Sequence, residues 1–391
     1  MREFYRKAGF FVLTVCFAFH VSAQKKSFQS LYHDLQVLQK QMVPDSRVAI
    51  FSFEFADTLQ KPVVIKGETN LPDAKKQLNF LLNNLNTSFV DSIRVLPDEA
   101  VGDKTWALVK LSVANLRAKP GDASELVSQA LLGMPLKVLD HKKGWYRVQT
   151  PENYIGWMDA GALQPITEAE LTNWKKTNRW IFNRVAGFVY EAASENSATV
   201  SDIVLGDLFT VETIENDWLK IRFPDGREGF VAKNSCLSYN DWVSIQNDFE
   251  RLYATARTMM GFPYLWGGTS TKGIDCSGFV KTAFYAQGMV LARDASQQAK
   301  YGEAVDFSKI ETLQPGDLLF FGRSAERITH VGIYISNGDF IHSSGRVHIG
   351  SLIPGDPKKD PARNLVAVRR IFDYADNEGV IPVKNHPWYN Q

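Results

Sequence analysis

The sequence predicts a multidomain protein in which a small α/β domain is followed by two β-rich modules and a domain that mixes helices and strands. Three observations support this fold class. The 391 residues, 45% of them hydrophobic, are enough for several separate cores. A set of residues recurs at a constant offset of 73 positions, and a motif around Cys276 precedes two spaced histidines. The net charge of +1 gives no argument for a nucleic-acid partner.

The start of the chain has the pattern of a targeting segment. Basic residues precede the apolar run Phe10–Phe19 and the small residues Val21-Ser22-Ala23, so we expect a signal peptide at 1–23. The run is too short to span a membrane. Cys16 follows Val15, which is a poor residue before a lipidation cut, so no lipid anchor is expected there. We therefore expect an exported protein of the periplasm or cell envelope.

Residues 24–104 predict a small α/β cap domain. The expected helices are Phe28–Met42 and Asp73–Asn86, and the expected strands are Arg47–Phe55, Val63–Lys66 and Phe89–Val95. No group of ionisable residues in this segment suggests catalysis, so packing and positioning are its expected role.

Residues 105–164 and 180–240 read as two copies of one module. The landmarks Val127, Gly133, Val138, Trp145 and Gly156 recur as Val200, Gly206, Val211, Trp218 and Gly229. A constant offset over so many positions indicates an internal duplication. Short alternating apolar runs broken by turn residues predict a small β-barrel in each copy. The linker 165–180 is expected to be helical.

Cys276 is placed where a cysteine can become a nucleophile. It opens an apolar run at helical spacing, Asp275 before it suits an N-cap, and Gly288 suits the C-terminal end of that helix. A thiol in the first helical turn faces the positive end of the helix dipole, which favours the thiolate. We therefore expect a lowered pKa and an ion pair with an imidazolium.

Two histidines can be placed by strand register. Residues 329–335 alternate like a strand, and 336–338 read as a three-residue hairpin loop. With that loop His342 lies opposite Gly332, and His330 shares its face at roughly 7–8 Å. A two-residue loop would place the two rings on opposite faces. We expect His330 to be the base and His342 to orient it.

Cys276 and the histidines also have possible non-catalytic roles. A single cysteine at a helix start is most often a small buried residue. Zinc would require three or four ligands at short spacing, and the sequence has neither Cys-x-x-Cys nor His-x-x-x-His, so no metal is expected. A disulfide from Cys236 to Cys276 would consume the nucleophile, so two free thiols are expected, with Cys236 packed as a small apolar residue.

Residues 246–372 resemble the NlpC-type cysteine peptidases of bacterial cell walls, which have a papain-like α+β fold. The resemblance rests on the two histidines and on three stretches, Tyr-Leu-Trp-Gly-Gly (264–268), Asp-Cys-Ser-Gly-Phe (275–279) and Leu-Gln-Pro-Gly-Asp-Leu-Leu-Phe-Phe (313–321). It implies Cys276 as nucleophile, His330 as general base and His342 as third polar residue, without a cofactor. The repeated modules resemble bacterial SH3-like modules.

The order of cap, two SH3-like modules and peptidase resembles the dipeptidyl-peptidase VI-like branch of that family. This resemblance implies a substrate with a free N-terminal L-alanine, held by Asp275 and Tyr154, with Glu125 as the module's carboxylate. The alternatives are a capping role alone for Asp275, a surface aromatic for Tyr154 and a solvated turn residue for Glu125. Buried ammonium groups need carboxylates around them, because their desolvation is otherwise too costly.

Further residues are assigned to the cleft by the same resemblance. Tyr264 and Trp266 resemble its wall, and the Tyr264 hydroxyl would stabilise the oxyanion together with the Cys276 backbone N–H. Ser277 lies beside the nucleophile. In Arg293-Asp-Ala-Ser296, on the far wall, Ser296 would hold the D-glutamyl α-carboxylate, and Arg293 is a further substrate-binding candidate. The alternative for Arg293 is an exposed side chain that is only solvated.

The expected activity is hydrolysis of the γ-D-glutamyl–diamino acid bond of peptidoglycan stem peptides or muropeptide fragments by a monomeric enzyme. One alternative is an endopeptidase acting on stems still attached to sugar. The other is an inactive wall-binding protein that works through its SH3-like modules, which the intact set of Cys276, His330 and His342 disfavours.

Overall fold

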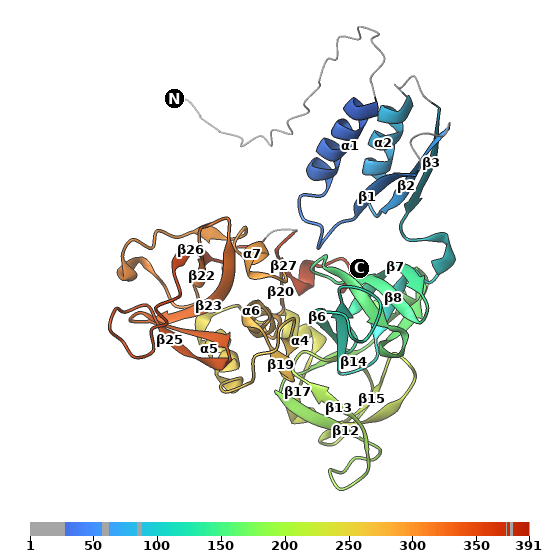
Figure 1. Cartoon of the computed structure of the whole chain (residues 1–391). Coiled ribbons are helices and arrows are strands. Elements are labelled where there is room, and N and C mark those ends of the chain that lie inside the picture. Colours follow the sequence, from blue (N-terminus) through green and yellow to red (C-terminus); the bar gives the residue numbers. More distant parts are fainter. Residues whose placement is uncertain (1–27, 57–61, 84–87, 373, 376–377, 391) are drawn as a thin grey trace, which may run out of the picture.

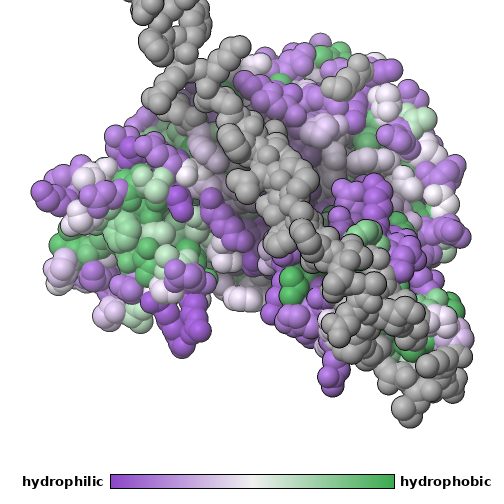
Figure 2. All heavy atoms as spheres, turned by 90° about the horizontal axis from the view of Figure 1, so that it is seen from above, coloured by the Kyte–Doolittle hydropathy of each residue, from purple (hydrophilic) through white to green (hydrophobic). Residues whose placement is uncertain are grey.

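The computed structural model describes residues 28–56, 62–83, 88–372, 374–375 and 378–390 (Figure 1). The signal peptide expected at 1–23, with Cys16, lies outside the described residues. Within the described ranges, no helix is both long enough and apolar enough to cross a membrane. Figure 2, which views the molecule from above, shows a mainly hydrophilic face with an apolar area at the left of the view.

The N-terminal domain is a three-stranded sheet with two helices packed against it (Figure 1). Its elements are α1 (Phe28–Met42), β1 (Phe51–Ala56), β2 (Val63–Thr69), α2 (Pro72–Asn83) and β3 (Phe89–Val95). Strands β1 and β2 are antiparallel, while β2 and β3 are parallel and are joined through α2. The buried side chains form their own core, which includes Leu31, Leu35, Ile65, Leu78 and Ile93. Both helices and all three strands are therefore present, but the first strand starts at Phe51 and not at Arg47, which lies in a turn. The end of the second helix expected at 84–86 lies outside the described residues.

The duplication is confirmed strand by strand. The first copy has β4 (Trp106–Val109), β5 (Val113–Arg117), β6 (Leu126–Leu131), β7 (Pro135–Lys142), β8 (Trp145–Gln149), β9 (Ile155–Asp159) and β10 (Leu163–Ile166). The second has β11 (Arg179–Phe182), β12 (Ala186–Tyr190), β13 (Thr199–Val204), β14 (Leu208–Glu215), β15 (Trp218–Arg222), β16 (Glu228–Ala232) and β17 (Cys236–Ser238). Every strand starts 73 positions after its counterpart, as 106 and 179 illustrate.

Both copies have the same strand order. It runs β10-β4-β7-β8-β9-β5-β6 in the first and β17-β11-β14-β15-β16-β12-β13 in the second. Among the described residues each order is open between its end strands, so barrel closure is not confirmed by the pairing. Gly133 and Gly206 occupy equivalent turns of the two copies, with φ of 71° and 96°. A Cβ at Gly133 would lie 2.0 Å from the Leu208 carbonyl oxygen of the other copy, so the repeated glycine is sterically required.

The linker between the copies contains the expected helix, α3 (Glu168–Lys175), which begins with a capping box between Thr167 and Glu170. A short helix, α4 (Tyr239–Val243), follows the second copy. Short 3₁₀ helices are η1 (Glu99–Val101), η2 (Ala160–Ala162), η3 (Lys233–Ser235), η4 (Ile310–Thr312) and η5 (Val383–Asn385).

The catalytic domain packs helices on a six-stranded sheet of order β21-β26-β22-β23-β24-β25. Its helices are α5 (Phe249–Thr258), α6 (Cys276–Tyr285) and α7 (Ala295–Gln298). Its sheet strands are β21 (Glu303–Ala304), β22 (Leu318–Gly322), β23 (Ile328–Ser336), β24 (Asp339–Ser344), β25 (Arg346–Ser351) and β26 (Leu365–Arg370). Helix α6 is buried along its whole length and packs against β23 and β24. Figure 1 shows α6 beside β23. A small hairpin of β18 (Thr269–Ser270) and β19 (Gly273–Ile274) precedes it.

The C-terminal segment, for which the sequence suggested no motif, is an integral part of the core. Strand β27 (Val380–Pro382) pairs with β20 (Met289–Leu291). Tyr389 is fully buried, and its carbonyl oxygen accepts a hydrogen bond of 2.9 Å from Arg179. The same hydrophobic core contains residues of the first SH3-like copy, α3, α4 and α6. This core contains residues from several of the expected domains. The domain boundaries expected from the sequence therefore stay predictions.

We predict that Tyr389→Ala lowers the free energy of unfolding by about 3–5 kcal/mol, because it leaves a cavity in a shared core. Urea unfolding followed by tryptophan fluorescence measures the change. Lys384→Ala, an exposed position in the same segment, is the matched control and should be near neutral. Equal stability of the two variants would contradict a structural role for the segment.

Candidate active site

Cys276 is the first residue of α6, and Asp275 caps the helix. The Asp275 carboxylate accepts a hydrogen bond of 2.7 Å from the Gly278 backbone N–H, so the expected N-cap is confirmed. The glycines of the motif allow the preceding loop to cross the helix start. A Cβ at Gly278 would lie 2.1 Å from the Gly268 carbonyl oxygen, and one at Gly268 would lie 2.2 Å from the Gly273 carbonyl oxygen. The backbone can therefore approach the nucleophile only with glycine at these positions.

The expected register of the two histidines is confirmed, but the expected loop is wrong. Tyr334 pairs with Phe340, which places His342 opposite Gly332. The turn is a two-residue Asn337-Gly338 turn with both φ positive, 50° and 85°, closed by Ser336 and Asp339. An extra residue between Tyr334 and Ser336 forms a bulge, which restores the register that a two-residue turn alone would shift.

The histidine rings meet as expected. His330 Nε2 and His342 Nδ1 lie 2.7 Å apart, with both side chains buried. Since Nε2 of His330 is engaged, Nδ1 is the ring nitrogen left for exchanging a proton with a thiol. Helix α6, which begins at Cys276, packs against β23, which carries His330. Cys276 and the candidate base therefore lie on two neighbouring elements, and the backbone N–H of Val331, the residue after His330, lowers the pKa of the Cys276 thiol.

The expected lowered thiol pKa is not found. Burial, followed by the charge of Asp275, raises the pKa of Cys276 to about 11, and the backbone N–H groups of Val331 and Ser277 offset this only in part. Burial also lowers the pKa of His330 well below its usual range and that of His342 to about 3. Both shifts favour the neutral forms, a protonated thiol and an uncharged imidazole.

A third histidine extends the pair and was missed from the sequence. His348 lies opposite His342 in the pairing of β24 with β25, and their ring centroids are 4.3 Å apart. Its Nδ1 lies 2.9 Å from the Arg346 carbonyl oxygen. The strand register of 342 and 348 was the signal available in the sequence. His348 follows His342 toward the surface, so the base is backed by a row of imidazoles.

A cleft of about 590 Å³ opens at Cys276. It contains nine of the eleven residues that the sequence assigned to the site: Glu125, Tyr154, Tyr264, Trp266, Asp275, Cys276, Ser277, Arg293 and Ser296. The two histidines do not line it. The first SH3-like copy supplies one wall and the catalytic domain the other, so the cleft is shared between them.

Arg293 lines the cleft, and the alternative of an exposed, solvated side chain is wrong. Its side chain is 1% exposed, and its guanidinium is 2.5 Å from Asp275 Oδ2 and 3.2 Å from Oδ1. It also donates to the hydroxyls of Ser277 at 3.0 Å and Ser128 at 3.1 Å. Asp275 accepts further bonds from the Gly267 and Gly278 backbone N–H groups and from the Ser277 hydroxyl. Asp275 is therefore saturated by protein donors.

The module residues occupy different depths. Tyr154 is buried, not a surface aromatic. Burial is the main cause that raises the pKa of its hydroxyl, and the negative charge of Asp294 raises that pKa further. Glu125 is exposed, and its carboxylate accepts a 2.8 Å hydrogen bond from the indole N–H of Trp266. The Trp266 residue is 65% exposed. Tyr264 is half-buried, and burial raises its pKa to about 12, so its hydroxyl keeps its proton. Glu125 and Trp266 thus join module and peptidase at the rim.

Two charged lining residues were missed. Asp294 lies inside the Arg-Asp-Ala-Ser motif but was not selected, whereas Arg47 comes from the N-terminal domain and no sequence signal marked it. Among the described residues there is no group of three or more histidines, cysteines, aspartates or glutamates arranged to hold a metal ion. Cys236 is a buried free thiol in the second SH3-like copy, as expected.

Two family models match this chain. Residues 261–360 match the NlpC/P60 family, and residues 116–163 match the bacterial dipeptidyl-peptidase Sh3 domain. The first range contains Cys276, His330 and His342, and the second contains Glu125 and Tyr154. The two matches therefore cover both walls of the cleft.

Curated relatives agree with the models. A gamma-D-glutamyl-L-lysine dipeptidyl-peptidase of Bacillus cereus is 33% identical over 64% of this chain and 76% of its own length. One of Bacillus subtilis is 31% identical over 63% and 81%. A crystal structure of an NlpC/P60 family protein from Bacillus cereus covers 68% of this chain and 99% of that chain at 25% identity, with a TM-score of 0.58. This chain therefore belongs to the NlpC/P60 family of cysteine peptidases.

Proposed function

We propose that this peptidase hydrolyses the γ-D-glutamyl–diamino acid bond of peptidoglycan stem peptides that have a free N-terminal L-alanine. The names of its Bacillus relatives support the bond, and the make-up of the cleft supports the free amine. We propose export to the periplasm or cell envelope, from the targeting pattern at 1–23, and action on wall fragments, because the alanine amine is free only after the sugar has been removed.

The acidic end of the cleft carries this proposal. Three carboxylates (Glu125, Asp275 and Asp294) and two guanidinium groups (Arg47 and Arg293) line the cleft, which leaves one negative charge in excess. A substrate ammonium would balance that charge, whereas an acylated amine would not. Desolvating an ammonium without a carboxylate beside it would cost several kcal/mol.

The saturation of Asp275 changes which side chain we assign to the ammonium. Five protein donors already bind Asp275, so its role is to cap α6 and to hold Arg293. Asp294 is less buried, with 27% of its side chain exposed, and it lies beside the Tyr154 hydroxyl. We assign the ammonium to Asp294, Tyr154 and Glu125, and the D-glutamyl α-carboxylate to the region of Ser296.

The mechanism follows from the neutral resting pair. As the sulfur of Cys276 attacks the γ-carbonyl carbon, its proton passes to Nδ1 of His330, whose Nε2–H donates to His342. The Cys276 backbone N–H and the Tyr264 hydroxyl stabilise the oxyanion. The intermediate collapses, the C–N bond breaks, and His330 protonates the leaving amine. Water deprotonated by His330 then hydrolyses the thioester and releases L-Ala-γ-D-Glu.

We predict that the protein releases L-Ala-γ-D-Glu from L-Ala-γ-D-Glu-diaminopimelate and not from the N-acetylated peptide, because acetylation removes the ammonium. Mass spectrometry of the products measures this. Cys276→Ala should abolish release, and Cys236→Ala is the matched control that should leave it unchanged. Equal cleavage of both peptides would contradict the free-amine requirement and favour an endopeptidase of sugar-attached stems.

We predict that alkylation of Cys276 by iodoacetamide keeps rising with pH well beyond neutrality, by about tenfold per pH unit between pH 7 and 10, because the thiolate is the reactive form. The rate keeps rising because the thiol pKa is raised, so the thiolate fraction is still increasing in this pH range. At each pH less thiolate is present than for an ordinary cysteine of pKa about 8.5. The Cys236→Ala variant, labelled over a range of pH and analysed by mass spectrometry, isolates the site. A plateau at neutral pH would instead indicate a stable thiolate–imidazolium pair.

A further inference from the structure

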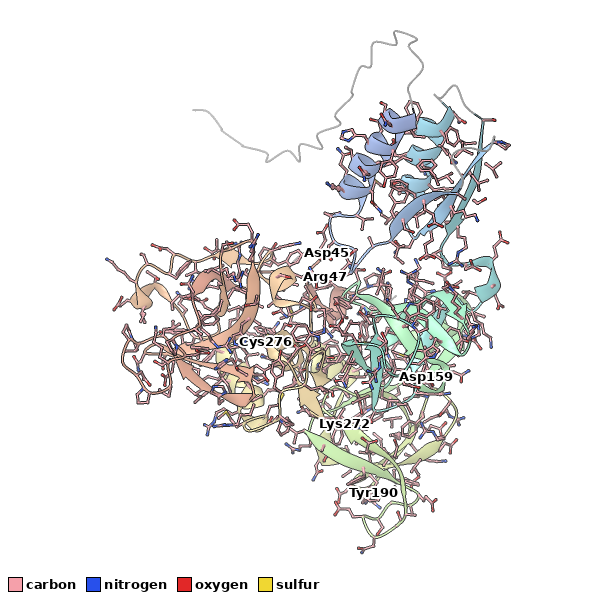
Figure 3. The ribbon with its side chains drawn as sticks, viewed as in Figure 1. Asp45, Arg47, Asp159, Tyr190, Lys272 and Cys276 are labelled. Atoms are coloured by element: carbon pink, nitrogen blue, oxygen red, sulfur yellow. The ribbon has the colours of Figure 1, made fainter. Side chains whose placement is uncertain are left out.

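The segment that joins α1 to β1 in the N-terminal domain reaches the active-site cleft. Arg47, in this segment, is one of the cleft's lining residues. Figure 3 shows Asp45 and Arg47 at the end of the N-terminal domain that faces the other domains. The N-terminal domain therefore contributes a side chain to a cleft otherwise built by the first SH3-like copy and the peptidase.

The guanidinium of Arg47 bridges two carboxylates. Its Nε and Nη2 donate to Asp45 at 2.8 and 2.7 Å, and its Nη1 donates to Asp294 Oδ2 at 2.8 Å and to the Ser296 hydroxyl at 3.1 Å. This contact pattern uses the fork of an arginine, with one edge on Asp45 and the remaining nitrogen on Asp294. A lysine ammonium, which is a point charge on a flexible stem, cannot reproduce it.

The segment around Arg47 is held from both walls of the cleft. From the catalytic domain, the Gln297 side chain donates to Asp45 Oδ2 at 2.9 Å. From the first SH3-like copy, the backbone N–H of Ile155, next to Tyr154, donates to the Arg47 carbonyl oxygen at 2.8 Å. The Gln149 side chain donates to the Val48 carbonyl oxygen at 3.0 Å. Hydrogen bonds from both walls of the cleft therefore fix the position of Arg47 relative to Asp294 and Tyr154.

We propose that Arg47 is a positioning residue that fixes Asp294 and Tyr154 at the amine end of the cleft and blocks the space beyond them. This inference rests on the proposed function, in which those two residues and Glu125 hold the substrate's ammonium. The N-terminal domain then decides which stems are accepted. A free alanine amine fits against Asp294, whereas an acyl group or sugar on that nitrogen meets the Arg47 side chain.

A role in domain docking alone would have a different signature. Arg94 provides the matched control, because it also joins the N-terminal domain to the first SH3-like copy. It lies 2.5 Å from Glu68, 2.6 Å from Asp98 and 3.0 Å from Asp140. The Arg94 side chain is 41% exposed against 37% for Arg47, and Arg94 does not line the cleft. Loss of docking would affect both variants, whereas loss of positioning would affect only Arg47.

The test measures kcat and KM of the full-length protein and of Arg47→Ala, Arg47→Lys and Arg94→Ala. The substrates are L-Ala-γ-D-Glu-diaminopimelate and its N-acetylated form. For Arg47→Ala we expect KM for the free peptide to rise about tenfold or more, with a smaller change in kcat. The preference for the free over the acetylated peptide should fall by about the same factor. Arg47→Lys should lie between alanine and wild type, and Arg94→Ala should keep the wild-type preference.

The outcomes separate this inference from the proposed function. If the wild type discriminates between the peptides and Arg47→Ala discriminates equally well, Arg47 has no positioning role and the inference is overturned. Equal losses on both peptides in the Arg47 and Arg94 variants would also overturn it, in favour of docking. If Arg47→Ala does not fold, Arg47→Lys decides, because an unchanged preference in that variant overturns the inference. A wild type that cleaves both peptides equally overturns the proposed function and the inference together.

Discussion

The buried ion pair between Asp275 and Arg293 is the interaction on which the site depends. The two side chains are 9% and 1% exposed, so neither could keep its charge there without the other. Through this pair the loop at Gly267, the start of α6 and Ser128 of the first SH3-like copy share one hydrogen-bond network. Cys276 at the start of α6, the loop at Gly267 and the module wall of the cleft are positioned by the same two charges.

The duplication gives the peptidase two equivalent supports. Gln129 of the first copy and Asp202 of the second are counterparts, 73 positions apart, and both contact the hairpin of β18 and β19 that leads to Cys276. Gln129 accepts from the Thr269 backbone N–H at 3.0 Å, and Asp202 lies 2.5 Å from the Lys272 ammonium. The modules therefore hold the approach to the nucleophile in addition to lining part of the cleft.

Local patterns predicted the elements well, because helix ends, turn residues and alternation act over a few positions. Helix Phe28–Met42 and strand Phe89–Val95 have the expected bounds, and the repeat predicted two identical strand orders. Properties set by tertiary packing could not be predicted in the same way. The burial of Arg293, the raised pKa of Cys276 and the arrival of Arg47 at the cleft all depend on segments distant in the chain.

The pairing of β27 with β20 has a consequence for biosynthesis. Strand β20 follows the nucleophile helix directly, but its partner is translated only after all the residues that line the cleft. A nascent chain that ends before residue 380 contains Cys276, His330 and His342 but lacks the strand that pairs with β20 and the tyrosine that completes the shared core. Assembly of this shared core therefore comes after translation of the cleft residues, so the peptidase is completed late in synthesis.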